Sequence, residues 1–333
     1  MGKNIPKEFK TISEQCNILI QQRNLNLINS SGCSIPISRL KCELIEKNYF
    51  DLVNGLDDII NNSPPNYKYY GNYSVDDLLE LYDFNKKIRE LILSTISEFE
   101  IRLKTSIAYH FSYVYSKHWN DYCNKNNYKK VTKNDINELF IAYYGYSKKY
   151  DGNFPNPNQK VMFPFFITNK KLIKKLKRKK RYLQAYDRQP PLWVAIKALD
   201  FGQLHKMFSL LKKDVAREVL FNFNFKISER NKFESVLYVI NWLRNECAHF
   251  EMINKSKYHG KYPVDNDLIK DLKLRTSKSG MNLTLFQTMC ILDSVQSFKE
   301  ELHDFFSKNK LQNKIKEEYL KSIGYWKQCG WNL

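Results

Sequence analysis

The chain contains 333 residues, of which 43% are hydrophobic and 14% aromatic, so it can bury the core of one large domain or two modest ones. With only 11 glycines and 10 prolines it is neither collagen-like nor of low complexity, and no apolar run approaches the roughly 18 residues of a membrane-spanning helix. Its 54 Lys and Arg residues outnumber 35 Asp and Glu residues, which gives a formal net charge of +19 and favours a polyanionic partner.

Two alternatives to a polyanionic partner account for the same charge. An anionic membrane surface would also attract a basic protein, and the abundance of Lys, Asn, Ile and Tyr is typical of an AT-rich genome, which raises the Lys content without any function. The first fifteen residues lack the apolar core of a secretory signal. We therefore expect a soluble, cytoplasmic protein with no membrane partner.

The seven cysteines are scattered singly, without a CxxC pair. This pattern predicts reduced thiols in the core rather than disulfides or a structural zinc site. The sequence also lacks the motifs GxxxxGKS/T, GxGxxG, HExxH and GxSxG. No motif therefore indicates a phosphate-binding loop, a zincin or a serine hydrolase. We expect no metal and no cofactor.

The first predicted helix lies within residues 8–28, where apolar residues recur with a helical period. Its apolar stripe consists of Phe9, Ile12, Cys16, Leu19 and Ile20. A second helix is expected to begin with Ser38 as its N-cap and to run toward Phe50.

Ser74 and Asp77 resemble a capping box that opens a third helix. Apolar residues with helical spacing continue from there to Tyr113. Such a helix would be about 50 Å long if unbroken, so we expect it to form the spine of the fold.

The second half of the chain is also predicted to be helical. Residues 145–168 are irregular, and their short Val161–Ile167 run is the only convincing strand pattern. Helices are expected after Pro191, over Phe233–Ala248 and over Leu283–Phe306, followed by a less ordered end. The helix after Pro191 would bury Leu192, Ile196, Leu199 and Leu204.

These elements predict an all-α fold. We assign residues 1–73 to an N-terminal helical region, 74–310 to the main helical domain and 311–333 to a basic C-terminal tail.

Nine of the twelve residues from Lys170 to Arg181 are basic. So many like charges repel one another unless a counter-charge is bound, although a solvated basic face is the ordinary alternative. We predict that this run binds RNA, with a tyrosine after it stacking on unpaired bases. The predicted contacts are Lys170, Lys171, Lys174, Lys175, Lys177, Arg178, Lys179, Lys180, Arg181 and Tyr182.

The hexapeptide RNECAH, from Arg244 to His249, ends the helix predicted over residues 233–248. An imidazole exchanges protons near cellular pH, and a guanidinium stabilises charge that develops on a phosphate. Removing the proton of a ribose 2′-hydroxyl lets that oxygen attack the adjacent phosphate, so this pair has the chemistry to cleave RNA without a metal. The alternative, which the spacing alone favours, is an Arg and a His that merely stabilise a helix end.

A wider pattern surrounds this hexapeptide. In chain order its segments are Asn48–Phe50, Leu81–Ile92, Glu98–His110, Pro191–Val194, Phe201–Leu204 and Arg244–His249. Together, over roughly residues 10–255, they resemble the Abi-like family and more narrowly its AbiD/AbiF abortive-infection group. RNECAH itself resembles the R-x4-6-H motif of the HEPN ribonuclease superfamily.

The resemblance implies an all-helical HEPN-like bundle with an N-terminal helical extension, in a phage-defence protein that binds RNA and cleaves it. It assigns Arg244 and His249 as the catalytic pair and Asn245 as their polar neighbour. Family members often continue with a second His and an Arg, whereas here Phe250-Glu251 follows. That departure leaves open a weaker acid/base network, or a site that holds RNA without cutting it.

Arg102 and His110 form a second Arg–His pair, with seven residues between them. Eight helical steps place them about 80° apart, on neighbouring faces of a helix. We predict a mostly structural role, because Tyr109 and Phe111 indicate core packing. Support of the site or contact with RNA is the alternative.

Two functions follow from these patterns. The first is a metal-independent endoribonuclease toxin, which needs both Arg244 and His249. The second is a weakly catalytic or non-catalytic module that binds a structured noncoding RNA, and a toxin restrained by a cognate RNA would combine the two. A DNA-binding repressor is a distant third, since no helix-turn-helix stands out. We expect a homodimer, because one motif supplies only one Arg and one His.

Overall fold

The computed structural model describes most of the chain. The described residues are 8–61, 70–71, 73–115, 122, 125–129, 191–249, 252–260, 263–275, 282–309, 311–326, 330–331 and 333. Within them the protein is all-α, as predicted, with two three-residue strands as the exception. The basic run Lys170–Arg181, Tyr182 and the predicted Val161–Ile167 strand lie outside the described residues.

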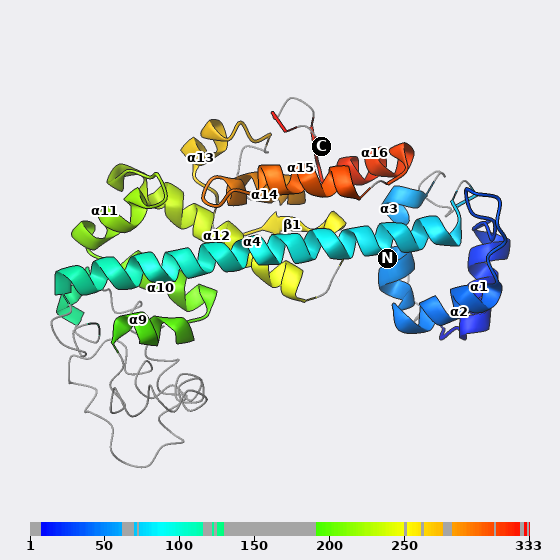
Figure 1. Ribbon diagram of the computed structural model, residues 1–333, viewed down its shortest axis with the longest axis horizontal. Coiled ribbons are helices and arrows are strands. Elements are labelled where there is room, and N and C mark those ends of the chain that lie inside the picture. Colours follow the sequence, from blue (N-terminus) through cyan, green and yellow to red (C-terminus); the bar gives the residue numbers. More distant parts are fainter. Residues whose placement is uncertain are drawn as a thin grey trace, which may run out of the picture. The chain divides into compact units, whose positions relative to one another are not determined.

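Figure 1 shows the helices in chain order. The α-helices are α1 (Ile12–Asn17), α2 (Ile37–Glu46), α3 (Asp57–Ile60), α4 (Val75–Tyr115), α9 (Leu192–Ala195), α10 (Phe201–Leu210), α11 (Lys213–Phe221), α12 (Arg230–Ala248), α13 (Asn266–Asp271), α14 (Leu285–Asp293), α15 (Lys299–Lys308) and α16 (Asn313–Ser322). Short π or 3-10 turns are η1 (Ile18–Gln22), η2 (Phe50–Asn54), η4 (Lys125–Asn127), η5 (Ile196–Ala198), η6 (Ile227–Glu229) and η7 (Ile253–Lys255). None of the described helices is both long enough and apolar enough to cross a bilayer.

Helix α4 is the long helix predicted from residue 74 onward. The Ser74 hydroxyl accepts the Asp77 N–H at 3.3 Å, and the Asp77 carboxylate accepts the Ser74 N–H at 2.8 Å. This capping box satisfies N–H groups that the first turn leaves without helical partners, and no Gly or Pro interrupts the 41 residues that follow.

The chain divides into two compact units, neither of which is one continuous range. Unit 1 comprises Met1–Thr95, Trp242–Lys261 and Ile269–Leu333, and unit 2 comprises Ile96–Asn241 and Tyr262–Leu268. Helices α4 and α12 each contribute to both units. The domain boundaries predicted after residues 73 and 310 stay predictions.

Unit 1 is built on the first half of α4, beside which α15 and α16 run in Figure 1. Phe84 of α4 is the centre of an aromatic cluster, with ring centroids 5.0–5.2 Å from Phe305 and Phe306 of α15 and Tyr319 of α16. Edge-to-face contacts of this kind add to the burial of the rings. They fix the C-terminal helices against α4.

Unit 2 is built on the second half of α4 with α9 to α11 and the first part of α12. Phe233 of α12 packs on Phe208 and Phe223 at 5.0 and 5.4 Å. Arg230 donates to the backbone carbonyls of Phe208, Ser209 and Leu211 at 2.9–3.0 Å, at the C-terminal end of α10. A cation that binds the exposed carbonyls of a helix end stabilises it, so Arg230 joins α12 to α10.

The predicted N-terminal helices are shorter or start elsewhere. The first ends at Gln22 rather than 28, because the Arg23 carbonyl accepts the Tyr70 N–H at 2.7 Å and Asn24 has a positive φ of 55°. Phe9, predicted on its buried stripe, is 87% exposed, so that prediction is wrong. The N-cap of α2 is Pro36, not Ser38, since its extended backbone already opens the helix.

Two helices predicted as continuous are interrupted by acidic side chains that cap a new helix. The Asp200 carboxylate accepts the Gln203 N–H at 2.9 Å, which starts α10 after the short α9–η5 segment. The Asp293 carboxylate accepts the N–H groups of Phe298 and Lys299 at 2.8 Å, which separates α14 from α15. In each case a carboxylate replaces a helical carbonyl as the hydrogen-bond acceptor.

The predicted less ordered end contains α16, whose Ile315 and Tyr319 are fully buried. The strands β1 (Lys257–His259) and β2 (Asn282–Thr284) pair antiparallel with Tyr258 opposite Leu283. Three residues are too few to produce a recognisable alternation, so the sequence did not predict them. Among the described cysteines Cys16, Cys247 and Cys290 are buried thiols, as expected, whereas Cys33 and Cys42 are exposed.

Candidate functional site

The hexapeptide RNECAH closes helix α12, as predicted. Apolar residues with helical spacing hold the helix in the core, and seven of those described are fully buried. These are Phe233, Val236, Leu237, Val239, Ile240, Leu243 and Cys247. Arg244 is half-buried, whereas Asn245 and His249 are exposed. The last turn therefore presents its polar residues away from its buried stripe.

Asn245 contacts both members of the predicted catalytic pair. Its side-chain oxygen accepts from Nη1 of Arg244 at 3.3 Å, and its carbonyl accepts the backbone N–H of His249 at 3.1 Å. The second bond continues the helical pattern one residue past α12, so His249 extends from a defined backbone position. Within the described part of the chain the His249 ring has no hydrogen-bond partner. That Arg244 and His249 line one cleft stays a prediction.

Cys247 and Tyr319 lie in the interior beside this turn. Burial raises the pKa of the Cys247 thiol to about 12, even though the nearby positive charge of Arg89 opposes the shift. Burial likewise raises the pKa of the Tyr319 hydroxyl. A thiol with so high a pKa is not a nucleophile at neutral pH, so Cys247 is a packing residue.

A buried hydrogen-bonded chain connects α4, α16 and the segment after the hexapeptide. The Tyr319 hydroxyl donates to Oδ1 of Asn85 at 3.0 Å, and Nδ2 of Asn85 donates to Sδ of Met252 at 3.3 Å. Asn85 is fully buried, so its amide satisfies both partners where water is excluded. It thereby fixes the chain three residues after His249.

Further contacts hold the same segment. Nζ of Lys255 donates to the Asn54 carbonyl at 2.9 Å and pairs with the Asp58 carboxylate at 3.1 Å. The Ser256 hydroxyl donates to the Glu246 carboxylate at 3.0 Å, which links the segment back to the hexapeptide. The chain is thus anchored on both sides of His249, a property that a catalytic side chain needs.

Gly55 makes this anchoring sterically feasible. A Cβ atom built on Gly55 would lie 2.5 Å from Cγ of Met252, well inside van der Waals contact. The side-chain amide of Asn254 donates to the Gly55 carbonyl at 3.3 Å. No sequence pattern points to a role for Gly55, Asn85 or Met252, because their connection depends on the fold. The one available signal in the sequence was that Asn85 lies within the Leu81–Ile92 segment, which resembles the family.

Arg102 and His110 belong to unit 2 and share one partner, Asn222. The side-chain amide nitrogen of Asn222 donates to the Ser106 hydroxyl and lies 2.9 Å from Nε2 of His110. The backbone carbonyl of Asn222 accepts from the Arg102 guanidinium at 3.5 Å. The Arg102 guanidinium lies 5.0 Å from the centre of the Phe223 ring. A direct role for this pair in function stays a prediction.

The residues beside His110 differ from the prediction in part. Phe111 is fully buried and packs on Tyr128 at 5.1 Å, as expected for a core residue. Tyr109, also assigned to the core, is 64% exposed. Two residues along a helix turn by about 200°, so both cannot share one buried stripe.

A family model described as "Abi-like protein" matches residues 44–254, which is more than half of the chain. The match includes α4 and the whole of α12, and it ends within the anchored segment after His249. No curated protein and no solved structure matches the chain.

Proposed function

The chain belongs to the Abi-like protein family, and on this premise we propose that it is an abortive-infection protein of phage defence that acts on RNA. More narrowly, we propose an AbiD/AbiF-type member of the HEPN superfamily that cleaves RNA without a metal, with Arg244 and His249 as its catalytic residues. The observation that carries the proposal is an exposed histidine one residue past the end of α12, within the matched range, whose chain is anchored on both sides.

The chemistry requires two proton transfers and no external nucleophile. A base removes the proton of a ribose 2′-hydroxyl, whose oxygen attacks the adjacent phosphorus while the bond from phosphorus to the 5′-oxygen breaks. An acid returns a proton to that 5′-oxygen, which leaves a 2′,3′-cyclic phosphate and a 5′-hydroxyl. His249 exchanges the protons, Arg244 stabilises the charge on the phosphate oxygens, and Asn245 holds the Arg244 guanidinium.

The test is a cleavage assay with end-labelled RNA in EDTA. The wild-type protein should produce fragments that end in 2′,3′-cyclic phosphate, and His249→Ala should cleave at least about a hundredfold more slowly. His110→Ala is the matched control, because it removes another histidine on a helix of the same chain. A substrate with 2′-deoxyribose at the cleaved position should remain intact.

Two results would contradict the proposal. Equal cleavage by the wild-type and His249→Ala proteins would assign the activity to a contaminant or to another site. Cleavage that persists with the 2′-deoxy substrate would exclude attack by the 2′-hydroxyl.

The second candidate function is a module that binds a structured noncoding RNA with little or no cleavage. The sequence Phe250-Glu251 after His249, in place of a second His and an Arg, favours it. In this case the wild-type protein binds RNA in EDTA without cutting it, and His249→Ala binds equally well. A cognate RNA that restrains a toxin would combine the two functions.

The RNA-binding role of Lys170–Arg181 and Tyr182 is part of the proposal. Phosphate contacts release counterions, so affinity should fall steeply as salt rises. Reversing the charges of Lys174, Lys175 and Arg178 together should flatten that dependence. An unchanged slope would place the electrostatic contacts elsewhere.

We also propose that the working unit is a homodimer, in which two copies of Arg244 and His249 face one RNA. One histidine then takes the proton from the 2′-hydroxyl and the other protonates the leaving oxygen. Light scattering on the protein freed of RNA gives its mass. A monomer that still cleaves RNA would refute the paired site.

A further inference from the structure

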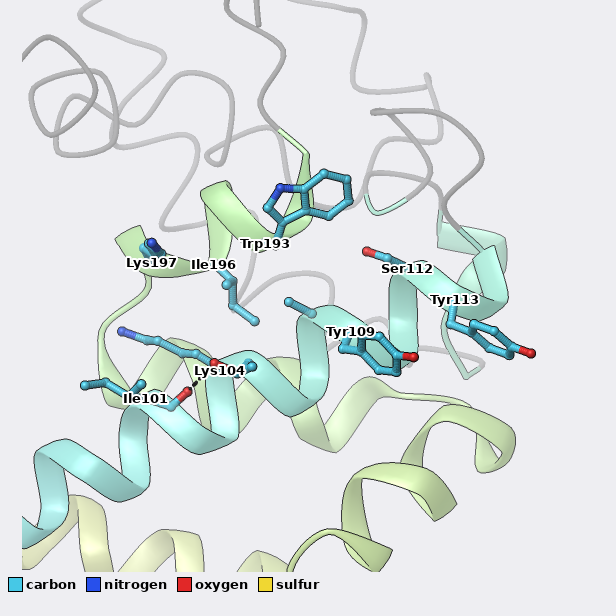
Figure 2. Close-up of a pocket in the computed structure, with 10 residues that line it drawn as sticks. Ile101, Lys104, Tyr109, Ser112, Tyr113, Trp193, Ile196 and Lys197 are labelled. Atoms are coloured by element: carbon cyan, nitrogen blue, oxygen red, sulfur yellow. Dashed lines mark hydrogen bonds between the residues drawn. The ribbon is translucent and has the colours of Figure 1, made fainter. Parts of the chain in front are cut away.

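A groove in unit 2 is bounded by the second half of α4 on one side and by α9 and η5 on the other (Figure 2). Its volume is about 800 Å³. The residues that line it are Ile101, Lys104, Thr105, Ala108, Tyr109, Ser112, Tyr113, Trp193, Ile196 and Lys197. Arg244 and His249 are not among them, so this groove is a different feature from the candidate catalytic site.

Three large aromatic side chains that line the groove are largely exposed. Tyr109 is 64% exposed, Tyr113 82% and Trp193 53%. Figure 2 shows Trp193 on one wall and the two tyrosines on α4 opposite it. The tyrosine rings lie one helical turn apart and nearly parallel, with an angle of 17° between their planes. Clustered exposed aromatic rings mark a site of interaction, and flat rings suit flat ligands.

The charged side chains among the described residues that line the groove are both lysines. No Asp or Glu occurs among the described residues that line it, whereas Lys104 and Lys197 do. Lys104 pairs with Glu100 and donates to the Leu199 carbonyl at 2.7 Å, so much of its charge is compensated. Lys197 lines the same groove and is exposed.

The groove also contains an unused hydrogen-bonding group. The Ser112 hydroxyl oxygen is buried, and within the described part of the chain it has no hydrogen-bond partner. Most buried polar atoms are paired, so this hydroxyl can take a partner when its side chain rotates toward the groove. The hydroxyl of Thr105, which also lines the groove, already donates to the Ile101 carbonyl at 2.9 Å.

We propose that this groove binds unpaired nucleotides of single-stranded RNA, whose bases stack on Tyr109, Tyr113 and Trp193. Lys197 faces the phosphates and the Ser112 hydroxyl bonds a base edge. Aromatic faces, a cation and a lone hydroxyl are the set that recognises unpaired nucleotides, whose faces are open, whereas a duplex keeps its bases stacked on one another. The inference rests on RNA as the partner in the proposed function, but not on cleavage.

The test measures the affinity of the full-length protein for a short oligouridylate by fluorescence anisotropy, in a His249→Ala background that prevents cutting. Tyr109→Ala and Tyr113→Ala should each weaken binding about tenfold, the usual effect of removing one stacking ring. Tyr113→Phe keeps the ring and should restore the affinity. Phe221→Ala is the matched control, since this ring is 75% exposed in the same unit but does not line the groove.

The specificity of the site is tested with a hairpin duplex of equal length, which should bind the wild-type and groove variants alike. Photocrosslinking of the oligouridylate should attach it to Tyr109, Tyr113 or Trp193. Unchanged affinity of both alanine variants would overturn the proposal, as would a tenfold loss with Phe221→Ala.

A second copy of the chain is the competing occupant. If the alanine variants convert a dimer into a monomer in light scattering while RNA affinity stays constant, the groove is a protein interface and the proposal fails. The outcome is separate from that of the catalytic proposal. If the groove variants weaken RNA binding but the wild-type protein cleaves no RNA, the groove proposal is supported and the nuclease proposal is refuted. If the protein cleaves RNA but the groove variants bind it as the wild type does, the nuclease proposal is supported and the groove proposal is refuted.

Discussion

The chain carries two Arg–His pairs on helices, and their surroundings differ. Arg102 and His110 both contact Asn222, and the Arg102 guanidinium lies against the Phe223 ring. Among the described residues Arg244 hydrogen-bonds only to its neighbour Asn245, and the His249 ring is exposed without a hydrogen-bond partner there. One pair takes part in packing, while the other stands at a helix end.

The difference separates the pair predicted to be structural from the pair proposed to be catalytic. Spacing along the helix does not, since both pairs are built from the same residue types on well-formed helices. What differs is where the rigidity comes from. The side chains of the first pair both contact Asn222, whereas around the second pair Ser256 and Lys255 hold the backbone and the His249 ring is exposed.

The largest expected effect is on RNA cleavage, when each of the two histidines is replaced by alanine in turn. His249→Ala should reduce RNA cleavage at least about a hundredfold, because it removes a group that transfers protons in the reaction. His110→Ala should cleave at nearly the wild-type rate. Cleavage that falls equally in both variants would break the distinction between the pairs.

A third histidine, His205 of α10, sharpens the comparison because it is buried. Its ring packs edge-on against Tyr238 at 4.1 Å, and burial, aided by the charge of Lys206, lowers its pKa to about 4. The unfolded chain, with an ordinary histidine pKa, then binds the proton more tightly than the folded protein. The contribution of the neutral His205 ring to the free energy of unfolding is therefore fully present above about pH 6.5 and is lost as the pH falls toward 4.

His205→Gln should remove that pH dependence. Relative to the wild type, its free energy of unfolding should fall about 2–3 kcal/mol less between pH 7 and pH 4.5. Urea unfolding at the two pH values measures this, with His303→Gln as the control at an exposed histidine. Equal losses in the wild-type and His205→Gln proteins would mean that His205 is protonated in the folded protein.

Asn85 tests whether backbone anchoring matters at the candidate site. Asn85→Leu leaves the buried Tyr319 hydroxyl without its acceptor, which should lower the free energy of unfolding by about 1–3 kcal/mol. It also releases Met252, so cleavage should decline in conditions where the protein is fully folded. Combining it with Tyr319→Phe should recover stability, since both polar groups are then absent, but not cleavage. Recovery of both would assign Asn85 to stability alone.

The sequence predicted the fold class and the place of the candidate site, but not the support of that site. Helical periodicity and the Ser74–Asp77 capping box are local signals, so helices α4 and α12 could be predicted from the sequence alone. The split at Asp200 was missed because the apolar spacing continues across it, although the capping box with Gln203 is itself a local signal. Asn85 and Met252 are 167 residues apart, and no single-sequence pattern joins residues at that separation.

Tyr109 illustrates a different kind of error. An aromatic residue between buried neighbours was assigned to the core, yet helix geometry turns its side chain outward into the groove with Trp193. Counting the angle around α4 from Phe111 would have placed it outside the core.

The smallest expected effect concerns Arg102, the structural counterpart of Arg244. Its hydrogen bond to the Asn222 carbonyl is long, at 3.5 Å, and its guanidinium lies 5.0 Å from the centre of the Phe223 ring. A cation–π contact at an exposed position contributes about 0.5–1 kcal/mol, and Arg102→Ala should lower the free energy of unfolding by that amount in urea. Arg217→Ala, at an exposed arginine on α11, supplies the baseline for loss of a surface charge.

RNA cleavage should be unchanged in both the Arg102→Ala and Arg217→Ala variants and strongly reduced by Arg244→Ala. A loss of cleavage in Arg102→Ala as large as in Arg244→Ala would show that both arginines act on the substrate, because the small contact energy of Arg102 cannot account for such a loss through unfolding.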